Sequence, residues 1–196
     1  YGNKIIFEEI NNDLALTFQY EWNSSNLFGF VKKAKFINHS NENVFVEILD
    51  GLQNILPFGI GSDLQNTTSN LGDAYKRSQL LPDSGLGIFA LSAIIVDKAE
   101  PSEALKANVV WSAGLNNPKY LLSTAQLHLF RNGGTINQEE DIKGEKGAYF
   151  IYSGFNLTPG VEKNWLLAAN VNQSQPAIIE LAESIKENNF TITELL

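Results

Sequence analysis

The side chains of this chain that could transfer protons are mainly carboxylates. Glu8 and Glu9 are adjacent, and Glu139, Glu140 and Asp141 form a second acidic group. Hydrolysis of a glycosidic bond generally needs two carboxyl groups placed on either side of that bond. Adjacent residues on a strand point to opposite faces, and a run of charges in a loop is usually solvated. These acidic groups therefore do not predict a catalytic pair.

Histidine and cysteine offer less chemistry still. The two histidines, His39 and His128, are far apart in sequence, and the chain has no cysteine. Their spacing matches no metal-binding motif, and the cysteine count excludes a thiolate nucleophile and a disulfide framework. We therefore expect no metal and no other cofactor.

The three tryptophans raise the question of sugar binding, because an exposed aromatic ring can stack on the apolar face of a sugar. Trp22, Trp111 and Trp165 are each in phase with apolar neighbours, which favours packing in the core. Trp22 lies at the end of its predicted strand, so its ring could remain accessible. We keep it as a candidate carbohydrate-binding residue.

Charge and hydropathy exclude two classes of partner. The net charge is -8, and only 14 residues are basic. Binding to nucleic acid or to an anionic membrane needs clustered Lys and Arg, and no apolar run approaches the roughly 20 residues that span a bilayer. We expect neither nucleic acid nor membrane as a partner, whereas the cellular compartment is not indicated by the sequence.

Strand patterns dominate the first third of the chain. Residues 4–10 and 14–22 are predicted strands, and the second has the clearest alternation of apolar and polar residues. Residues 28–60 then contain two alternating stretches around a polar turn at residues 38–43, which predicts a hairpin. Four apolar residues near its end are predicted to cover one end of the domain or to face another domain: Leu52, Ile55, Leu56 and Phe58.

A long polar segment follows at residues 61–84. Connections of this length inside a compact domain are uncommon and often carry binding groups; a short helix near residues 75–81 would shorten it. Together with Trp22, the candidate carbohydrate-binding residues of the chain are Asp63, Asp73, Tyr75 and Asp83.

The rest of the chain adds further strands and one helix. Predicted strands lie at residues 86–96, 105–113, 121–131, 149–157 and 165–171, with a solvated loop at residues 138–147. An apolar stripe after Pro176 predicts a helix to residue 187. The fold class is therefore mostly β, a large antiparallel two-sheet sandwich with a C-terminal helix.

The predicted organisation is a sandwich at residues 1–173, a closing or linker helix at residues 174–189, and the start of a following segment at residues 190–196. The chain begins without methionine and contains none. We expect it to be either a processed product or a piece of a longer protein, and we favour the second.

Three stretches carry a family resemblance: FGFVKKAKFINHSNENVFVEILDGLQNILP, PDSGLGIFALSAIIV and FNLTPGVEKNWLLAANVNQSQPAIIELAESIKEN. In this order they resemble the N-terminal β-sandwich of cellobiose-phosphorylase-like glycoside phosphorylases and hydrolases. The resemblance implies a galactose-mutarotase-like supersandwich that leads into a helical (α/α)6 barrel, which carries the catalytic acid. It therefore implies no catalytic residue in this chain.

Three functions stay open on these observations. The preferred hypothesis is a non-catalytic domain of a larger carbohydrate-active enzyme, which packs against a helical catalytic domain and lends it a loop. The second is an independent carbohydrate-binding module. The third, a self-contained epimerase or hydrolase, would need a converging set of His, Asp and Glu that the sequence does not show.

Overall fold

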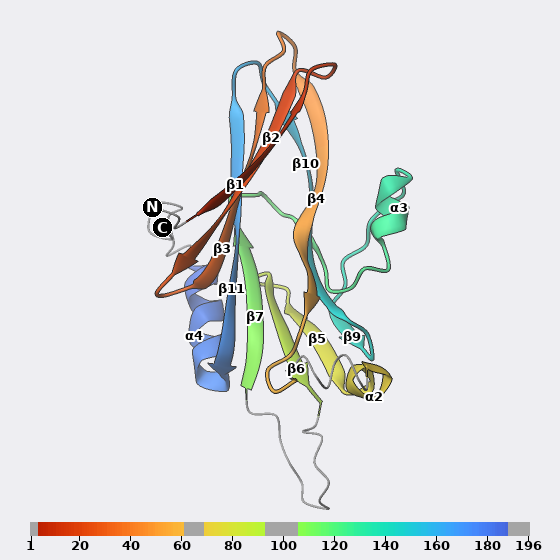
Figure 1. Cartoon of the computed structure of the whole chain (residues 1–196), viewed down its shortest axis with the longest axis vertical. Coiled ribbons are helices and arrows are strands. Elements are labelled where there is room, and N and C mark those ends of the chain that lie inside the picture. The colour runs from red at the N-terminus through yellow and green to blue at the C-terminus, as the bar shows by residue number, and fades with distance from the viewer. Residues whose placement is uncertain (1–3, 61–68, 93–105, 188–196) are drawn as a thin grey trace, which may run out of the picture.

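The computed structural model describes residues 4–60, 69–92 and 106–187, and Figure 1 shows strands packed in two sheets with helices on the outside. In chain order the elements are β1 (Ile5–Asn11), β2 (Leu16–Ser25), β3 (Gly29–Asn38), β4 (Val44–Ile55), α2 (Ser69–Ala74), β5 (Lys76–Leu81), β6 (Leu86–Leu91), β7 (Lys106–Ala113), β8 (Lys119–Leu121), α3 (Leu127–Arg131), β9 (Asp141–Lys143), β10 (Gly147–Leu157), β11 (Glu162–Ser174) and α4 (Gln175–Lys186).

Two antiparallel sheets make up the described part of the chain. The large sheet has the strand order β1-β2-β3-β11-β7-β6-β5-β9, and the small sheet has the order β4-β10-β8. The prediction of a mostly β, two-sheet sandwich with a C-terminal helix is confirmed. Within residues 4–60, 69–92 and 106–187, none of the helices has the length and apolar character of a membrane-spanning segment.

Apolar side chains fill three layers. The main core lies between the sheets and joins Trp165 and Leu167 of the large sheet to Tyr149 and Ile151 of the small one. A second cluster lies under α4, on the outer face of the large sheet, and a third lies between the small sheet and α3. Both faces of each sheet are therefore partly covered, which explains why several strands are apolar on both sides.

The predicted hairpin at residues 28–60 is wrong. Strand β3 pairs with β2 and β11, whereas β4 pairs with β10 in the other sheet. The polar turn between them is a corner that joins the two sheets. Asn38 is fully buried there and donates to the carbonyl oxygens of Glu42 (2.8 Å) and Leu157 (2.9 Å). Alternation shows that each strand has a buried face, but it does not identify the neighbouring strand.

The short helix considered near residues 75–81 is not found, because residues 76–81 form β5. The helix α2 comes just before it. Along β5 the buried positions include Lys76 and Ser78 as well as Leu80. Because two of these buried residues are polar, the sequence does not show the alternation of apolar and polar residues that predicts a strand. The predicted loop at residues 138–147 contains the short edge strand β9, which pairs with β5.

The predicted strand at residues 121–131 breaks after its first residue. Strand β8 ends at Leu121, and α3 begins at Leu127. The carboxylate of Glu139 accepts hydrogen bonds from the backbone N–H groups of Leu122 (2.8 Å) and Ser123 (2.9 Å). These bonds satisfy the backbone where the strand stops. Residues 93–96 of the strand predicted at residues 86–96 lie outside the described residues.

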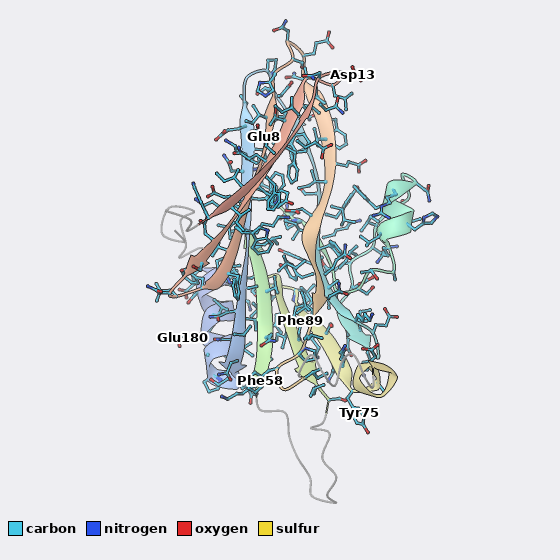
Figure 2. All side chains as sticks on the ribbon, viewed as in Figure 1. Glu8, Asp13, Phe58, Tyr75, Phe89 and Glu180 are labelled. Atoms are coloured by element: carbon cyan, nitrogen blue, oxygen red, sulfur yellow. The ribbon has the colours of Figure 1, made fainter. Side chains whose placement is uncertain are left out.

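The four apolar residues near the end of β4 do not form one exposed patch. Leu52 and Ile55 pack against the main core. Phe58 is 39% exposed, and the Lys106 ammonium lies 5.4 Å from the centre of its ring. Figure 2 shows Phe58 at one end of the molecule, so this segment covers an end of the sandwich.

Candidate functional site

A pocket of about 510 Å³ lies where three segments meet, and we name it the Asp83 pocket. The turn between β5 and β6 supplies one wall, the connection from β7 to β8 supplies another, and the last residues of α4 supply the third. Its polar lining includes Asp83, Ser112, Asn117, Tyr120, Gln138 and Lys186.

The turn is built tightly against the pocket floor. The backbone N–H groups of Ser84 (3.2 Å) and Gly85 (2.9 Å) donate to the Leu81 carbonyl oxygen. Gly85 has a φ of 66°, and a Cβ at this position would lie 2.2 Å from the Tyr120 hydroxyl oxygen. Glycine is required here both for the backbone conformation and for the close approach of Tyr120.

Two tyrosines form the floor. The Tyr149 hydroxyl donates to the Gly85 carbonyl oxygen at 2.6 Å and lies 3.4 Å from the Ser112 hydroxyl. The centres of the Tyr149 and Tyr120 rings are 5.8 Å apart. Tyr149 therefore fixes the turn from below, while the half-buried Tyr120 faces the pocket.

Burial keeps both phenols protonated. It raises the pKa of Tyr120, although a hydrogen bond with Ser112 opposes this shift. Burial, and then the nearby Tyr120, raise the pKa of Tyr149 well above its ordinary value. At neutral pH both groups are neutral hydroxyls that can donate a hydrogen bond, and neither can act as a general base.

The charges at the pocket are few and paired. Lys186 at the end of α4 lies 3.0 Å from the Asp83 carboxylate, and the Asp83 side chain is 80% exposed. Asp83 is the only carboxylate among the described residues that line the pocket. The arrangement provides neutral hydrogen-bonding groups without the second carboxyl that glycoside hydrolysis needs.

Several carboxylates elsewhere in the described ranges are held by structural partners. Asp141 accepts two hydrogen bonds from the Arg77 guanidinium, at 2.8 and 3.1 Å, and Glu139 binds the backbone N–H groups already described. Glu47 accepts a hydrogen bond from Tyr152. The described residues contain no group of three or more His, Asp and Glu side chains suited to a metal ion.

The structure does not gather the predicted carbohydrate-binding residues into one site. Asp83 follows β5, whereas Asp73 and Tyr75 precede it, so the length of the strand, about 20 Å, separates them. Asp73 accepts a hydrogen bond from Lys76 at 2.6 Å, and Figure 2 shows Tyr75 at the end of the molecule near α2.

Trp22 and Asp63 are the two remaining candidate carbohydrate-binding residues. Trp22 is half-buried on β2 and pairs with Ile5 and Lys32 in the large sheet. Because β2 is three strands from β7, about 14 Å separates Trp22 from Ser112 in the pocket. Asp63 lies outside the described residues.

Sequence reasoning missed the pocket residues on the connection from β7 to β8. A signal was present in Gly114, Asn116, Asn117 and Pro118, which are typical turn residues. Gly114 and Asn117 have φ values of 99° and 44°. What the sequence did not indicate is that this turn lies beside the β5–β6 turn, because that depends on how the strands are ordered in the sheet.

No protein-family model matches the sequence, and no curated protein matches it. Among solved structures, a chain described as "Putative kojibiose phosphorylase from human microbiome" aligns with 98% of this chain and 21% of its own length, at 11% identity and a TM-score of 0.42. A family GH92 alpha-mannosidase from Bacteroides thetaiotaomicron aligns with 100% of this chain and 27% of its own length, at 10% identity and a TM-score of 0.33. The chain thus spans about a fifth to a quarter of these two chains, and TM-scores this low do not establish a shared fold.

Proposed function

We propose that the chain is a non-catalytic β-sandwich domain, of the galactose-mutarotase-like kind, within a larger carbohydrate-active enzyme, a glycoside phosphorylase or hydrolase. The observation that carries this proposal is the state of the carboxylates. Asp141 is bound by the Arg77 guanidinium, Glu139 by backbone N–H groups and Glu47 by the Tyr152 hydroxyl. Among the described residues that line the Asp83 pocket, Asp83 is the only carboxylate. Acid–base chemistry at a glycosidic bond needs two groups across one cavity.

The edge of the large sheet supports packing against another domain. Every residue of β1 is exposed, including Ile5, Ile6, Phe7 and Ile10. Ile5 and Phe7 lie on one face of this edge strand, and Ile6 and Ile10 lie on the other. Exposed apolar surface at the edge of a sheet often marks a contact with another domain or protein. The resemblance in sequence to the first domain of cellobiose-phosphorylase-like enzymes supports a helical catalytic domain as that neighbour.

An activity assay tests the non-catalytic role. The purified chain is incubated with aryl glycosides, with disaccharides plus phosphate, and with freshly dissolved aldoses to detect mutarotation. We expect no turnover above background. Turnover that disappears in Asp63→Asn, Asp73→Asn or Asp83→Asn would contradict the proposal and make the chain an enzyme in its own right.

An independent carbohydrate-binding module is the second candidate, and the hydroxyl and carboxamide groups that line the Asp83 pocket favour it. The reading frame that encodes the chain separates the two candidates. A long helical catalytic region encoded in the same frame supports the first, whereas a frame that encodes the sandwich and α4 alone supports the second.

A further inference from the structure

We propose that the Asp83 pocket binds a neutral sugar of one or two rings. This inference deepens the proposed function, because it assigns a ligand class to a domain that does no chemistry itself. The volume of about 510 Å³ falls in the range of small-molecule sites.

The lining is suited to hydroxyl groups. Tyr120 and Ser112 each carry a neutral hydroxyl that can donate and accept, and Asn117 and Gln138 each add a carboxamide with a donor and an acceptor. A sugar ring offers the same mixture of donors and acceptors on neighbouring carbons. The half-buried Tyr120 ring also offers an aromatic surface within the same pocket.

The charges disfavour ionic ligands. A phosphate or carboxylate at the mouth of the pocket would lie near Asp83, and an organic cation would lie near Lys186; these two side chains are 3.0 Å apart. Neither kind of ion would find an uncompensated partner there. A neutral ligand gains hydrogen bonds without separating the pair.

The walls are held in place before any ligand arrives. Tyr149 fixes the Gly85 carbonyl from below, and Tyr120 occupies the space where a side chain at position 85 would lie. Polar groups held in this way lose less conformational freedom when they bind a ligand. The rigidity of the floor therefore favours binding.

Two other cavities fit a sugar less well. A cavity of about 400 Å³ beside α4 is lined largely by apolar groups, among them Leu27, Phe28 and Leu181. A cavity of about 200 Å³ on the outer face of β2 and β3 is small and lined by Glu21, Lys33, Lys35 and Glu162.

Titration by saturation-transfer NMR and calorimetry tests the proposal with D-glucose, D-mannose, D-galactose, maltose and cellobiose. D-glucuronate and D-glucose 6-phosphate serve as charged probes. We expect saturable binding of at least one neutral sugar and weaker binding of the charged analogues. No saturable binding of any neutral sugar at high millimolar concentration would overturn the proposal, as would tighter binding of the charged probes.

Variants locate the site. Asn117→Gly removes an exposed carboxamide and retains a residue that tolerates positive φ. Tyr120→Phe removes the pocket hydroxyl, with Tyr152→Phe as the matched control on the small sheet. We expect Asn117→Gly and Tyr120→Phe each to weaken binding by about fivefold, because each removes a hydrogen-bonding group, and Tyr152→Phe to leave it unchanged.

Binding that all three variants affect equally would place the site elsewhere and overturn the assignment. The outcomes also separate this inference from the proposed function. An inactive chain that binds no sugar contradicts only the pocket assignment, whereas catalytic turnover contradicts the proposed function.

Discussion

Lys32 on β3 and Asp50 on β4 form an ion pair that joins the large sheet to the small sheet. The two side chains are only 8% and 12% exposed. The Lys32 ammonium also lies 4.7 Å from the centre of the Tyr20 ring, and Asp50 accepts a hydrogen bond from the Trp165 indole at 2.8 Å. The pair therefore anchors one side of the sandwich core through both sheets.

Asp50→Asn should destabilise the fold by about 3–5 kcal/mol, because the substitution leaves the Lys32 charge buried without its partner. Urea unfolding followed by circular dichroism measures the change. Glu162→Gln is the control, since its partner Lys35 lies 3.9 Å away in an exposed pair; we expect its midpoint to be nearly unchanged.

A double variant tests the cause of this loss. Lys32→Met/Asp50→Asn removes both charges and keeps an amide oxygen for the Trp165 indole. It should be more stable than Asp50→Asn alone if the unpaired charge causes the loss. A double variant no more stable than the single one would contradict the ion-pair explanation.

The helix α4 provides a matched pair of adjacent isoleucines. Ile178 is 8% exposed and packs against the large sheet, whereas Ile179 is 53% exposed. Ile178→Ala should cost about 2–4 kcal/mol through the lost burial and the cavity that it leaves.

Ile179→Ala should change stability by less than about 0.5 kcal/mol, because Ile179 is exposed and alanine has the higher helix propensity. Leu181 is only half-buried, so its truncation should cost less than that of Ile178. Thermal unfolding of the three variants measures this order, and equal costs for the two isoleucines would place the helix in a different rotation.

The ion pair between Arg77 and Asp141 should make a small contribution to stability that depends on pH. The hydrogen bonds from Arg77 hold the pKa of the Asp141 carboxyl below its ordinary value, with the charge of Arg77 and then that of Lys143 acting in the same direction. A carboxyl with a lowered pKa in the folded state stabilises the fold above its unfolded pKa, and this contribution is lost as the pH falls through the folded pKa.

Carboxyl NMR titration should therefore show Asp141 ionising below its ordinary range, and Arg77→Gln should raise its pKa. The stability difference between wild type and Arg77→Gln should disappear on acidification below the folded pKa of Asp141. A difference that persisted in strong acid would mean that Arg77 stabilises the fold by packing rather than by charge.

Local patterns predicted most strands, but not how the strands are paired. The alternation in β2 and β10 reflects one buried face, which follows from the two-residue period of a strand. The partners of β3 and β4 depend on contacts far apart in sequence, such as that between Asn38 and Leu157. Lys76 shows why the pattern of β5 was missed. Its side chain is charged, yet it is buried, with Asp73 as its partner.

The Asp83 pocket could be predicted only in part for the same reason. Asp83 was a candidate because it ends a polar segment. Ser112 lies in the strand predicted at residues 105–113, and Tyr120 lies just before the strand predicted at residues 121–131. They reach Asp83 only because β7 lies beside β6 in the large sheet and β8 packs across from them.

Gly85 and Gly133 offer the sharpest test of the pocket geometry. Both have a positive φ, 66° and 70°, and a left-handed conformation costs a non-glycine residue about 1–2 kcal/mol. A Cβ on Gly85 would lie 2.2 Å from the Tyr120 hydroxyl oxygen and 2.4 Å from its ring carbon, whereas a Cβ on Gly133 would meet nothing within 4 Å.

Gly133→Ala should therefore cost about 1–2 kcal/mol, from the backbone conformation alone. Gly85→Ala should cost more, because Tyr120 is half-buried and must shift to admit the methyl group. Amide NMR spectra should show shifts around Ser112 and Tyr120 in Gly85→Ala and only local shifts in Gly133→Ala. Equal costs in the two variants, with no change at Tyr120, would mean that the turn does not press on the tyrosine, and the rigid floor of the pocket would lose its main support.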